Sequence, residues 1–161
     1  MTVSVREGRA ADIARVSTLD RQLSPVFRNE LSYRRLLAPT GLLVIAEEHD
    51  QLLGFAALSL AVDEATLLNL AVAKAVRRRG CATSLLSASA TRLAARQVRR
   101  VLLEVRESNG AARTLYARCG FREDARRPAY YPGVGGGERE AAILMSQSLP
   151  ALREATARPL A

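Results

Sequence analysis

Three features of the sequence combine residue types and spacing that could carry chemistry. The first is the basic run Arg77-Arg78-Arg79-Gly80-Cys81-Ala82-Thr83, which joins an apolar run to a helical one. Backbone N–H groups and the helix dipole favour anions at a helix start, and small residues allow a close approach. The run therefore indicates a pyrophosphate site, with a solvent-exposed, arginine-rich helix start as the alternative. Its spacing fits neither a Walker loop nor a dinucleotide glycine triplet.

The second feature is Glu104, an acid inside the otherwise apolar stretch RVLLEVR at residues 100–106. Burial among apolar neighbours favours the neutral form of a carboxyl group and so makes it a better general base. The alternative is that the strand alternates and Glu104 faces water. The residues alone leave both interpretations open.

The third feature is a short helix that carries polar side chains. Asn109 is a good N-cap, and Gly120 suits the position just past a helix that ends at Cys119. Tyr116 would lie on this helix, and its ordinary role would be a core residue with a hydrogen-bonded hydroxyl. Each of these signals is common by itself.

The hydrophobic pattern predicts the elements that position these residues. Helices are expected over residues 12–23, 29–37, 83–97 and 109–119, and strands over 3–6, 42–47, 52–62, 66–73, 100–106, from 121 onward and 142–148. This order predicts a mixed α/β fold with one domain over residues 1–149. Residues 150–161 contain two prolines and show no periodicity, which predicts a flexible C-terminal tail.

Length and composition exclude several classes of protein. The 161 residues fit one domain, and 48% hydrophobic with 25% charged residues excludes general disorder. No apolar run is long enough for a membrane span, and the start MTVSVREGRAAD lacks a secretory pattern. Cys81 and Cys119 are too few for a disulfide framework, and the single His49 is predicted in a surface turn. We therefore expect a cytoplasmic protein with no metal site and no Ser-His-Asp or Cys-His catalysis.

The charge of +8 is unevenly distributed along the chain. Residues 1–73 hold seven Lys or Arg and nine Asp or Glu, whereas residues 74–127 hold fourteen and four. Such a basic segment predicts an anionic partner, either nucleic acid or a phosphate-bearing small molecule. Nucleic-acid surfaces interleave aromatic residues, but residues 74–127 contain only Tyr116 and Phe121. A non-catalytic nucleic-acid-binding module is therefore the less favoured alternative.

Taken in order, the motifs NLAV, Arg77-x-x-Gly80-x-Ala82, LEVR, SNxAAxxLY and GF resemble the GNAT superfamily of N-acetyltransferases. The resemblance covers residues 63–148. Within the superfamily, DEATLLNLAV, LEVRESN, LYARCGF and AYYP most resemble the bacterial ribosomal-protein-alanine N-acetyltransferases. The resemblance implies a single-domain GNAT fold, in which a central, mostly antiparallel sheet has a splayed parallel strand pair and flanking helices. It also implies acetyl-CoA as the donor.

The resemblance assigns expected roles to matching residues. Glu104 would accept a proton and Tyr116 would donate one, with direct acetyl transfer in a ternary complex. Contacts with acetyl-CoA would come from a strand, the basic run and the short helix: Leu70, Ala71, Val72, Arg77, Arg78, Arg79, Gly80, Cys81, Ala82, Thr83 and Asn109. The acceptor would be the α-amino group of a protein N-terminus, most closely that of a ribosomal protein.

Departures from the family pattern leave the acceptor open. Ala82 stands where many members have glycine, which the motif tolerates, and Pro25-Val26-Phe27 replaces a common Pro-Trp-Ser. A lysine side chain, a small-molecule amine or an aminoacyl-tRNA therefore stay alternative acceptors. Tyr130 and Tyr131 either gate the acceptor peptide or pack against a strand. We expect a monomer or weak dimer with no membrane contact and with nucleic acid as a secondary partner.

Overall fold

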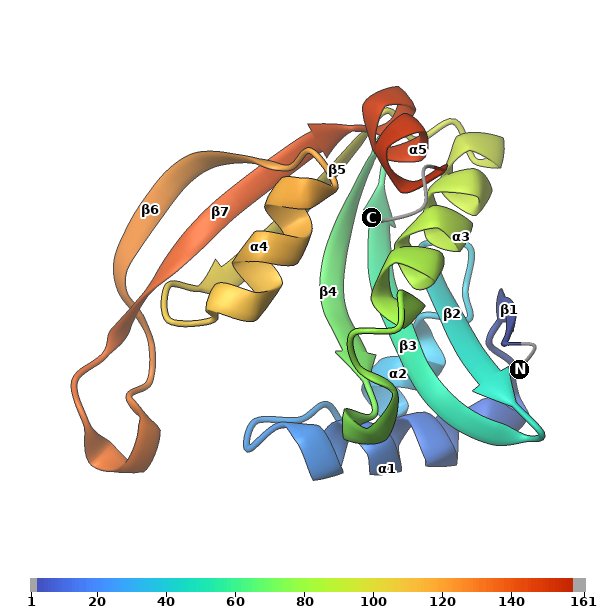
Figure 1. Ribbon diagram of the computed structural model, residues 1–161, viewed down its shortest axis with the longest axis horizontal. Coiled ribbons are helices and arrows are strands. Elements are labelled where there is room, and N and C mark those ends of the chain that lie inside the picture. The colour runs from blue at the N-terminus through green and yellow to red at the C-terminus, as the bar shows by residue number, and fades with distance from the viewer. Residues whose placement is uncertain (1–2, 158–161) are drawn as a thin grey trace.

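One twisted sheet organises the chain (Figure 1). The computed structural model describes residues 3–157. Within them, seven strands lie in the order β1-β2-β3-β4-β5-β7-β6. Every neighbouring pair is antiparallel except β4 and β5, which are parallel. The strands are β1 (Ser4–Glu7), β2 (Gly41–Glu48), β3 (Gln51–Ala61), β4 (Glu64–Val72), β5 (Arg100–Arg106), β6 (Arg122–Tyr131) and β7 (Glu140–Ser148).

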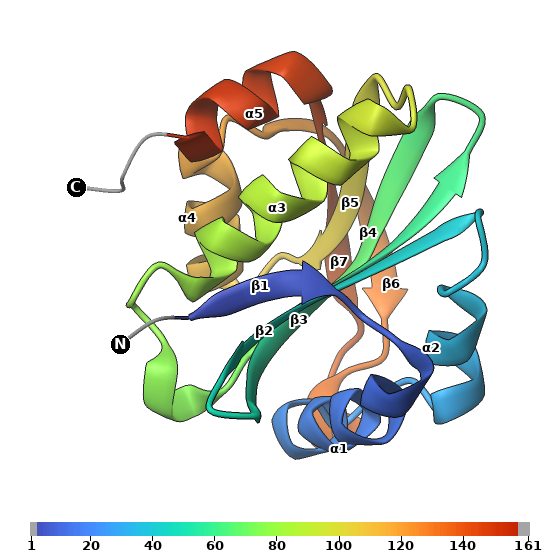
Figure 2. The ribbon, with the colours of Figure 1, turned by 90° about the vertical axis from the view of Figure 1, so that its right-hand side faces the viewer.

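Helices cover both faces of the sheet (Figure 2). On one face lie α1 (Ile13–Leu23) and α2 (Glu30–Arg35), and on the other lie α3 (Cys81–Ala95), α4 (Gly110–Arg118) and α5 (Leu149–Ala157). Three short 3₁₀ turns complete the described chain: η1 (Ala10–Asp12), η2 (Lys74–Val76) and η3 (Val134–Gly136). The predicted mixed α/β fold, with one parallel pair in a mostly antiparallel sheet, is confirmed.

The core is divided by the sheet into two layers because side chains alternate along each strand. In β2, Leu42 and Val44 pack in the layer beneath α3, whereas Leu43 and Ile45 pack in the layer beneath α1 and α2. The strands at the centre of the sheet are therefore apolar on both faces, which explains the continuous hydrophobic runs in the sequence.

Most predicted elements lie where the local pattern placed them. Strand β5 has the predicted bounds, and Ser24-Pro25 follows the end of α1. Asn109 caps α4 by accepting a hydrogen bond from the backbone N–H of Ala112 at 3.2 Å. His49 is exposed in the β2–β3 turn, and both cysteines are free, as expected.

The predicted flexible tail at residues 150–161 is wrong over its first part. Residues up to Ala157 form α5, and Leu149, Leu152 and Thr156 are buried along one side of it. Pro150 did not prevent the helix because proline is tolerated in the first turn, where its missing N–H is not needed. Residues 158–161 lie outside the described part of the chain.

A partly buried ion-pair network connects the first strand and the first helix to β2. Asp12 accepts hydrogen bonds from the guanidinium groups of Arg6 and Arg15 and from the backbone N–H of Arg9. Glu47 pairs with the same two arginines, at 2.7 Å and 2.6 Å. The network joins elements that are far apart in the sequence.

Residues 3–157 lack two kinds of feature. No helix there is long and apolar enough to cross a lipid bilayer. No group of three His, Cys, Asp or Glu side chains is arranged to hold a metal ion.

Candidate active site

The central feature of the site is an opening between β4 and β5. The two parallel strands are paired from Glu64 to Leu67 and from Arg100 to Leu103. Beyond these residues both strands continue, but they diverge (Figure 1). The last part of β4 is therefore paired with β3 along one edge, and its other edge has no strand neighbour. Of the predicted residues, Leu70 and Val72 point their backbone groups to that open edge, and Ala71 between them points its backbone groups to β3.

A bulge marks the point where β4 leaves its partner. Leu67 pairs with Leu58 and Asn69 pairs with Ala57, so Leu68 is an extra residue in β4. The bulge makes two successive side chains, Leu68 and Asn69, face the layer of α1 and α2. Bulges bend a strand and aim its groups in new directions, often beside functional sites.

The start of α3 lies next to this opening and presents free N–H groups. The first helical hydrogen bond runs from the N–H of Ser84 to the carbonyl of Gly80, so the N–H groups of Cys81, Ala82 and Thr83 have no helical carbonyl to bind. Gly80 has a left-handed backbone, with φ of 79°, and open space where a Cβ would stand. The Oγ1 atom of Thr83 is buried without a hydrogen-bond partner among residues 3–157. These are the features of an anion site.

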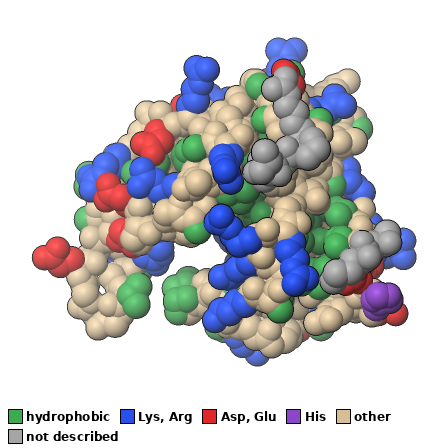
Figure 3. All heavy atoms as spheres, viewed as in Figure 1, with side chains coloured by type: hydrophobic (Ala, Val, Ile, Leu, Met, Phe, Trp, Pro, Cys, Tyr) green, Lys and Arg blue, Asp and Glu red, His purple; other side chains and the backbone are tan. Residues whose placement is uncertain are grey.

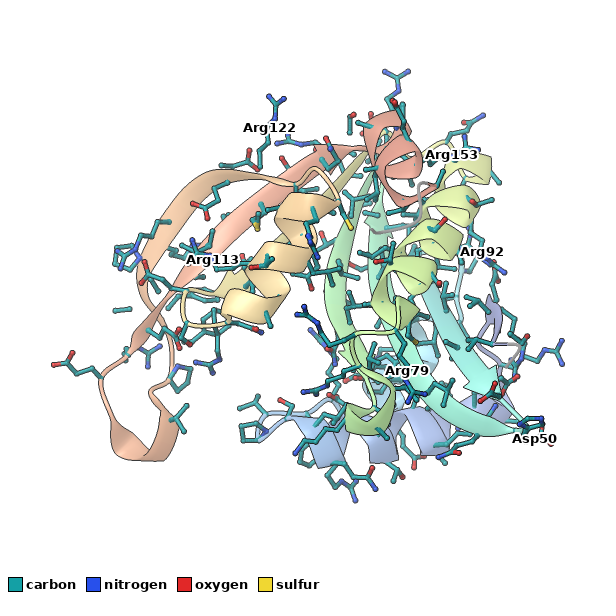
Figure 4. All side chains as sticks on the ribbon, viewed as in Figure 1. Asp50, Arg79, Arg92, Arg113, Arg122 and Arg153 are labelled. Carbon is teal, nitrogen blue, oxygen red and sulfur yellow. The ribbon has the colours of Figure 1, made fainter. Side chains whose placement is uncertain are left out.

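The basic side chains around this helix start are not neutralised. Within the described chain no carboxylate pairs with Lys74, Arg77, Arg78 or Arg79, and Figure 4 shows Arg79 at the start of α3. Arg77 donates its Nε–H to the carbonyl of Val72 at 3.1 Å and so connects the basic run to the end of β4. The arginines further along behave differently, since Arg92 and Arg96 pair with Glu7, Arg99 with Asp63 and Arg100 with Glu64.

Tyr116 approaches the opening from α4. Its ring packs against Phe121, with the ring centroids 5.7 Å apart, in the layer beneath α3 and α4. Burial, and to a smaller extent Cys119 and Tyr131, raise the pKa of the Tyr116 hydroxyl above its ordinary value. Among residues 3–157 the Tyr116 hydroxyl forms no hydrogen bond with another protein group. The raised pKa keeps the phenol protonated at neutral pH.

Glu104 is on the other face of β5. Val101, Leu103 and Val105 of this strand are buried in the α3 layer, so Glu104 points to the opposite face, the one on which α1 and α2 lie. No helix covers that face at β5, and the Glu104 side chain is 34% exposed. The interpretation in which the strand alternates and Glu104 reaches water is confirmed. Its carboxylate pairs with Arg127 of β6 at 3.4 Å.

Tyr131, at the end of β6, lies near both predicted catalytic residues. Burial, and next the charge of Glu104, raise the pKa of the Tyr131 hydroxyl. Tyr131 in turn contributes to the raised pKa of the Tyr116 hydroxyl. Its ring stacks on the guanidinium of Arg106 at 4.5 Å and meets Tyr130 edge-on at 5.0 Å. Tyr131 therefore packs against its neighbours and also borders the site.

A second bulge sets the direction of these tyrosines. Arg127 pairs with Ala142 and Tyr131 with Glu140, so β6 has extra residues in between. Ala129, within that stretch, has a positive φ of 50°. The side chain of Arg139 donates to the carbonyls of Ala129 and Tyr130 at 2.9 Å and 2.8 Å and so holds the distorted segment in place.

A hollow separates the β6–β7 end from the body of the protein (Figure 3). Lys and Arg side chains gather along its body side, and hydrophobic side chains lie on the two tips that face each other across it. The exposed large hydrophobic residues fit these tips. Val26 and Phe27 belong to the α1–α2 loop, and Tyr130 and Val134 belong to the β6–β7 end.

A buried polar cluster was not predicted from the sequence. Asp20 of α1 and Tyr33 of α2 form a hydrogen bond of 2.5 Å, and the Asn69 amide donates to Asp20 at 3.0 Å. One signal was available, because Asp20 falls on the same helical stripe as the buried Ile13 and Val16. An acid at such a position indicates a buried polar contact.

The structure thus brings the predicted residues together around one opening. Leu70, Ala71 and Val72 form one wall, the residues from Arg77 to Thr83 lie at the α3 end, and Asn109 and Tyr116 come from α4. Glu104 reaches the same opening from the far face of β5. The Asn109 side-chain oxygen is occupied by the helix cap, which leaves its amide N–H groups for a ligand.

Comparison with known proteins gives a consistent result. Residues 11–121 match the Acetyltransferase (GNAT) family. Over 99 residues the chain is 42% identical to the [Ribosomal protein bS18]-alanine N-acetyltransferase of Haemophilus ducreyi, covering 62% of this chain and 68% of that protein. The crystal structure of the ribosomal-protein-S18-alanine N-acetyltransferase from Escherichia coli matches with a TM-score of 0.84 and 28% identity, over 92% of this chain and 94% of that one. Arabidopsis thaliana NAA60 in complex with acetyl-CoA shares the fold, with a TM-score of 0.79 and 20% identity over 92% and 99% of the chains.

Proposed function

The chain belongs to the acetyltransferase (GNAT) family, and from this membership and the geometry of the site we propose that it transfers the acetyl group of acetyl-CoA to the α-amino group of a protein N-terminus. The N-terminal alanine of a small-subunit ribosomal protein is the proposed acceptor. The observation that carries the proposal is the free start of α3, with its unneutralised cations, directly beside the open edge of β4.

The start of α3 fits the pyrophosphate of acetyl-CoA. The N–H groups of Cys81, Ala82 and Thr83 point out of the helix, and the buried Thr83 hydroxyl lacks a partner within residues 3–157. Gly80 leaves open space for the close approach of a phosphate. Lys74, Arg78 and Arg79 add charge-assisted contacts. Asn109, at the start of α4, adds a further donor.

The open edge of β4 fits the pantetheine arm and the thioester. The backbone groups of Leu70 and the N–H of Val72 point to this edge and have no strand to pair with, so they are free to hydrogen-bond an extended ligand, whereas the backbone groups of Ala71 point to β3. When an amine attacks the thioester carbonyl, negative charge develops on the carbonyl oxygen. Preorganised backbone N–H groups stabilise such charge more than water does.

Glu104 is the proposed proton acceptor. A peptide α-amine titrates near ~7.7–8.0, so much of it is protonated at neutral pH and must lose a proton before it attacks. The Glu104 carboxylate faces the open side of β5, where an amine can approach from the α1–α2 face, and it takes the proton directly or through a water.

Tyr116 is the proposed proton donor. The departing thiolate of CoA needs a proton, and the raised pKa of Tyr116 keeps its hydroxyl protonated until then. Its position in the opposite layer from Glu104 suits a donor that acts from the other side of the reacting carbonyl. The reaction then needs no covalent enzyme intermediate.

The hollow between the α1–α2 loop and the β6–β7 end is the proposed site for the acceptor peptide. Val26 and Phe27 on one tip and Tyr130 and Val134 on the other offer apolar surfaces to the first side chains of a peptide. Exposed apolar surface at facing tips is typical of binding sites. Glu104 borders the same hollow, so a bound N-terminus would end at the proposed base.

The proposal is tested with purified protein, acetyl-CoA and two synthetic peptides. One carries the N-terminal sequence of a ribosomal protein S18 with a free alanine, and the other is the same peptide blocked at its N-terminus. We expect mass spectrometry to show acetylation of the free alanine and no reaction of the blocked peptide. Acetylation of the blocked peptide on lysine would contradict the α-amine proposal, and no reaction of either peptide would reject a peptide acceptor.

A further inference from the structure

One buried carboxylate connects three parts of the protein. Asp20 lies on the apolar stripe of α1 and is 2% exposed. A carboxylate in this position is strongly unfavourable unless it is paired or fully hydrogen-bonded. No ion pair with Asp20 occurs within residues 3–157, and three hydrogen-bond donors surround it instead.

The three donors come from three different segments. The Tyr33 hydroxyl of α2 donates to Oδ2 of Asp20 at 2.5 Å, and the backbone N–H of Arg28 donates to the same oxygen at 2.9 Å. The Asn69 amide of β4 donates to Oδ1 at 3.0 Å and also to the Tyr33 oxygen at 3.1 Å. Both carboxylate oxygens are therefore used.

The contact with Asn69 depends on the β4 bulge. Side chains alternate along a regular strand, so Asn69 would face the opposite layer if Leu68 were not an extra residue. The hydrogen bonds of Asn69 are made only in the bulged register, and they stabilise that register. Leu70, the next residue, begins the open edge of β4.

The contact with Arg28 restrains the α1–α2 loop. Arg28 follows Val26 and Phe27, the apolar residues at one tip of the hollow. The hydrogen bond from its backbone N–H to Asp20 restrains a loop that is otherwise exposed. The same carboxylate thus holds the loop on the acceptor side and the strand on the donor side.

Tyr33 keeps its donor role over the working pH range. Burial, and next its hydrogen bond to Asp20, raise the pKa of the Tyr33 hydroxyl well above its ordinary value. The hydroxyl therefore stays protonated and continues to donate to the carboxylate.

We propose that Asp20 is a positioning residue that sets the distance between acceptor and donor, holding the α1–α2 loop through Arg28 and the β4 bulge through Asn69 and Tyr33. This inference rests on the proposed acetyl transfer to a peptide. It assigns to the Asp20 cluster (Asp20, Tyr33 and Asn69) a role in turnover beyond its contribution to folding.

The test replaces the whole cluster with apolar residues of similar size, in the triple variant Asp20→Leu/Tyr33→Phe/Asn69→Val. Replacing a complete buried polar network in this way is often neutral for stability, so we expect an unfolding midpoint within about 4 °C of the wild type. The fixed distance is nevertheless lost, and kcat/KM with the free-alanine peptide should decrease by about ten- to a hundredfold. Acetyl-CoA affinity should decrease less than kcat/KM does, because the proposed pyrophosphate site at the α3 start contains none of the three replaced residues.

Two further variants separate positioning from folding. Ile45→Val removes one methyl group from the same layer, so it should lower the midpoint by about 2–4 °C and leave kcat/KM unchanged. In Asp20→Asn, the side-chain oxygen of the new residue can still accept hydrogen bonds from the Tyr33 hydroxyl and the Arg28 N–H. Its amide group can donate to the Asn69 side-chain oxygen once the Asn69 amide rotates by 180°. This variant should therefore recover most of the activity that the triple variant loses.

Amide hydrogen exchange of Arg28, followed by NMR without substrate, tests the cluster independently of activity. The Arg28 N–H should exchange at least about tenfold faster in the triple variant than in the wild type or in Ile45→Val. Unchanged exchange, or a triple variant with wild-type kcat/KM, would overturn the inference. Failure of the wild type to acetylate any peptide would instead reject the proposed function, while the exchange rates would still show whether Asp20 fixes the loop.

Discussion

The guanidinium group of Arg127 lies 3.4 Å from the carboxylate of Glu104, although 23 residues separate them in the sequence. The same guanidinium lies over the ring of Tyr130, 4.9 Å from its centre. Arg127 therefore joins the proposed base to the tip of the acceptor hollow. A protonated amine that enters the hollow would compete with Arg127 for the Glu104 carboxylate. This competition would place the ammonium proton next to the carboxylate that is proposed to remove it.

Glu104→Gln should lower kcat/KM by about 10²–10⁴-fold, because an amide cannot accept the proton of the ammonium group. Acetyl-CoA binding, measured by calorimetry, should not change. The matched control is Glu107→Gln, an exposed acid that pairs with Arg126 at 2.9 Å. Its rate should be that of the wild type, and a Glu104→Gln variant with full activity would remove Glu104 from the mechanism.

Arg78→Ala and Arg79→Ala should each weaken acetyl-CoA binding by about tenfold or more, since a charge-assisted hydrogen bond contributes about 1.5–3 kcal/mol. Calorimetric titration with acetyl-CoA measures the effect. Arg99→Ala is the control, because this side chain is 84% exposed and lies 4.0 Å from Asp63. Equal affinities for all three variants would place the pyrophosphate elsewhere.

Leu152→Ala should lower the free energy of unfolding by about 2–5 kcal/mol, because it leaves a cavity where α5 packs on α3. Urea unfolding at equilibrium gives the value. Arg153→Ala, on the exposed side of the same helix, should change it by less than about 0.5 kcal/mol. Similar effects of the two substitutions would show that α5 does not pack as described.

Asp12→Asn should destabilise the protein by about 1–3 kcal/mol at pH 7, and by progressively less in acid. Burial opposes a charge on Asp12, but hydrogen bonds from Arg6 and Arg15 and from the backbone of Arg9 hold the pKa of Asp12 well below its usual value. A lowered pKa stabilises the folded state above the pKa of the unfolded chain, about 3.9, and this contribution is lost as pH falls below it.

Urea unfolding of both proteins at pH 7, 5, 4 and 3 checks this dependence. The two curves of stability against pH should stay a constant distance apart from pH 7 to 5 and should approach each other from pH 5 to 3 without meeting, because the folded-state pKa of Asp12 lies well below that of the unfolded chain. A difference that stays constant from pH 5 to 3 would mean that the Asp12 charge is not the source of the effect.

Elements defined by local signals could be predicted from the sequence. The bounds of β5 follow from a short apolar run, and α4 follows from the Asn109 cap and Gly120, which has a positive φ of 84° after the helix. The free N–H groups at the start of α3 also follow locally, because the first turn of any helix lacks carbonyl partners.

Features that depend on contacts between distant residues could not be predicted. Arg127, the ion-pair partner of Glu104, comes from another strand. The exposure of Glu104 itself depends on which face of the sheet lacks a helix. Asn69 reaches Asp20 only because β4 is bulged, and nothing in the local pattern indicates an extra residue at Leu68. The helix α5 was not predicted because residues 150–161 contain two prolines and show no periodicity, whereas Pro150 lies in the first turn, where proline is tolerated.

The pairing of arginines with acids has a kinetic consequence. Arg92, Arg96 and Arg100 are offset by carboxylates from the first part of the chain, so the positive field of this face is concentrated where Lys74 and Arg77–Arg79 stand. Such a focused field attracts a polyanion while it is still diffusing in solution and guides it to one end of the opening. Capture should therefore be fast in dilute buffer and slow steeply as ionic strength rises.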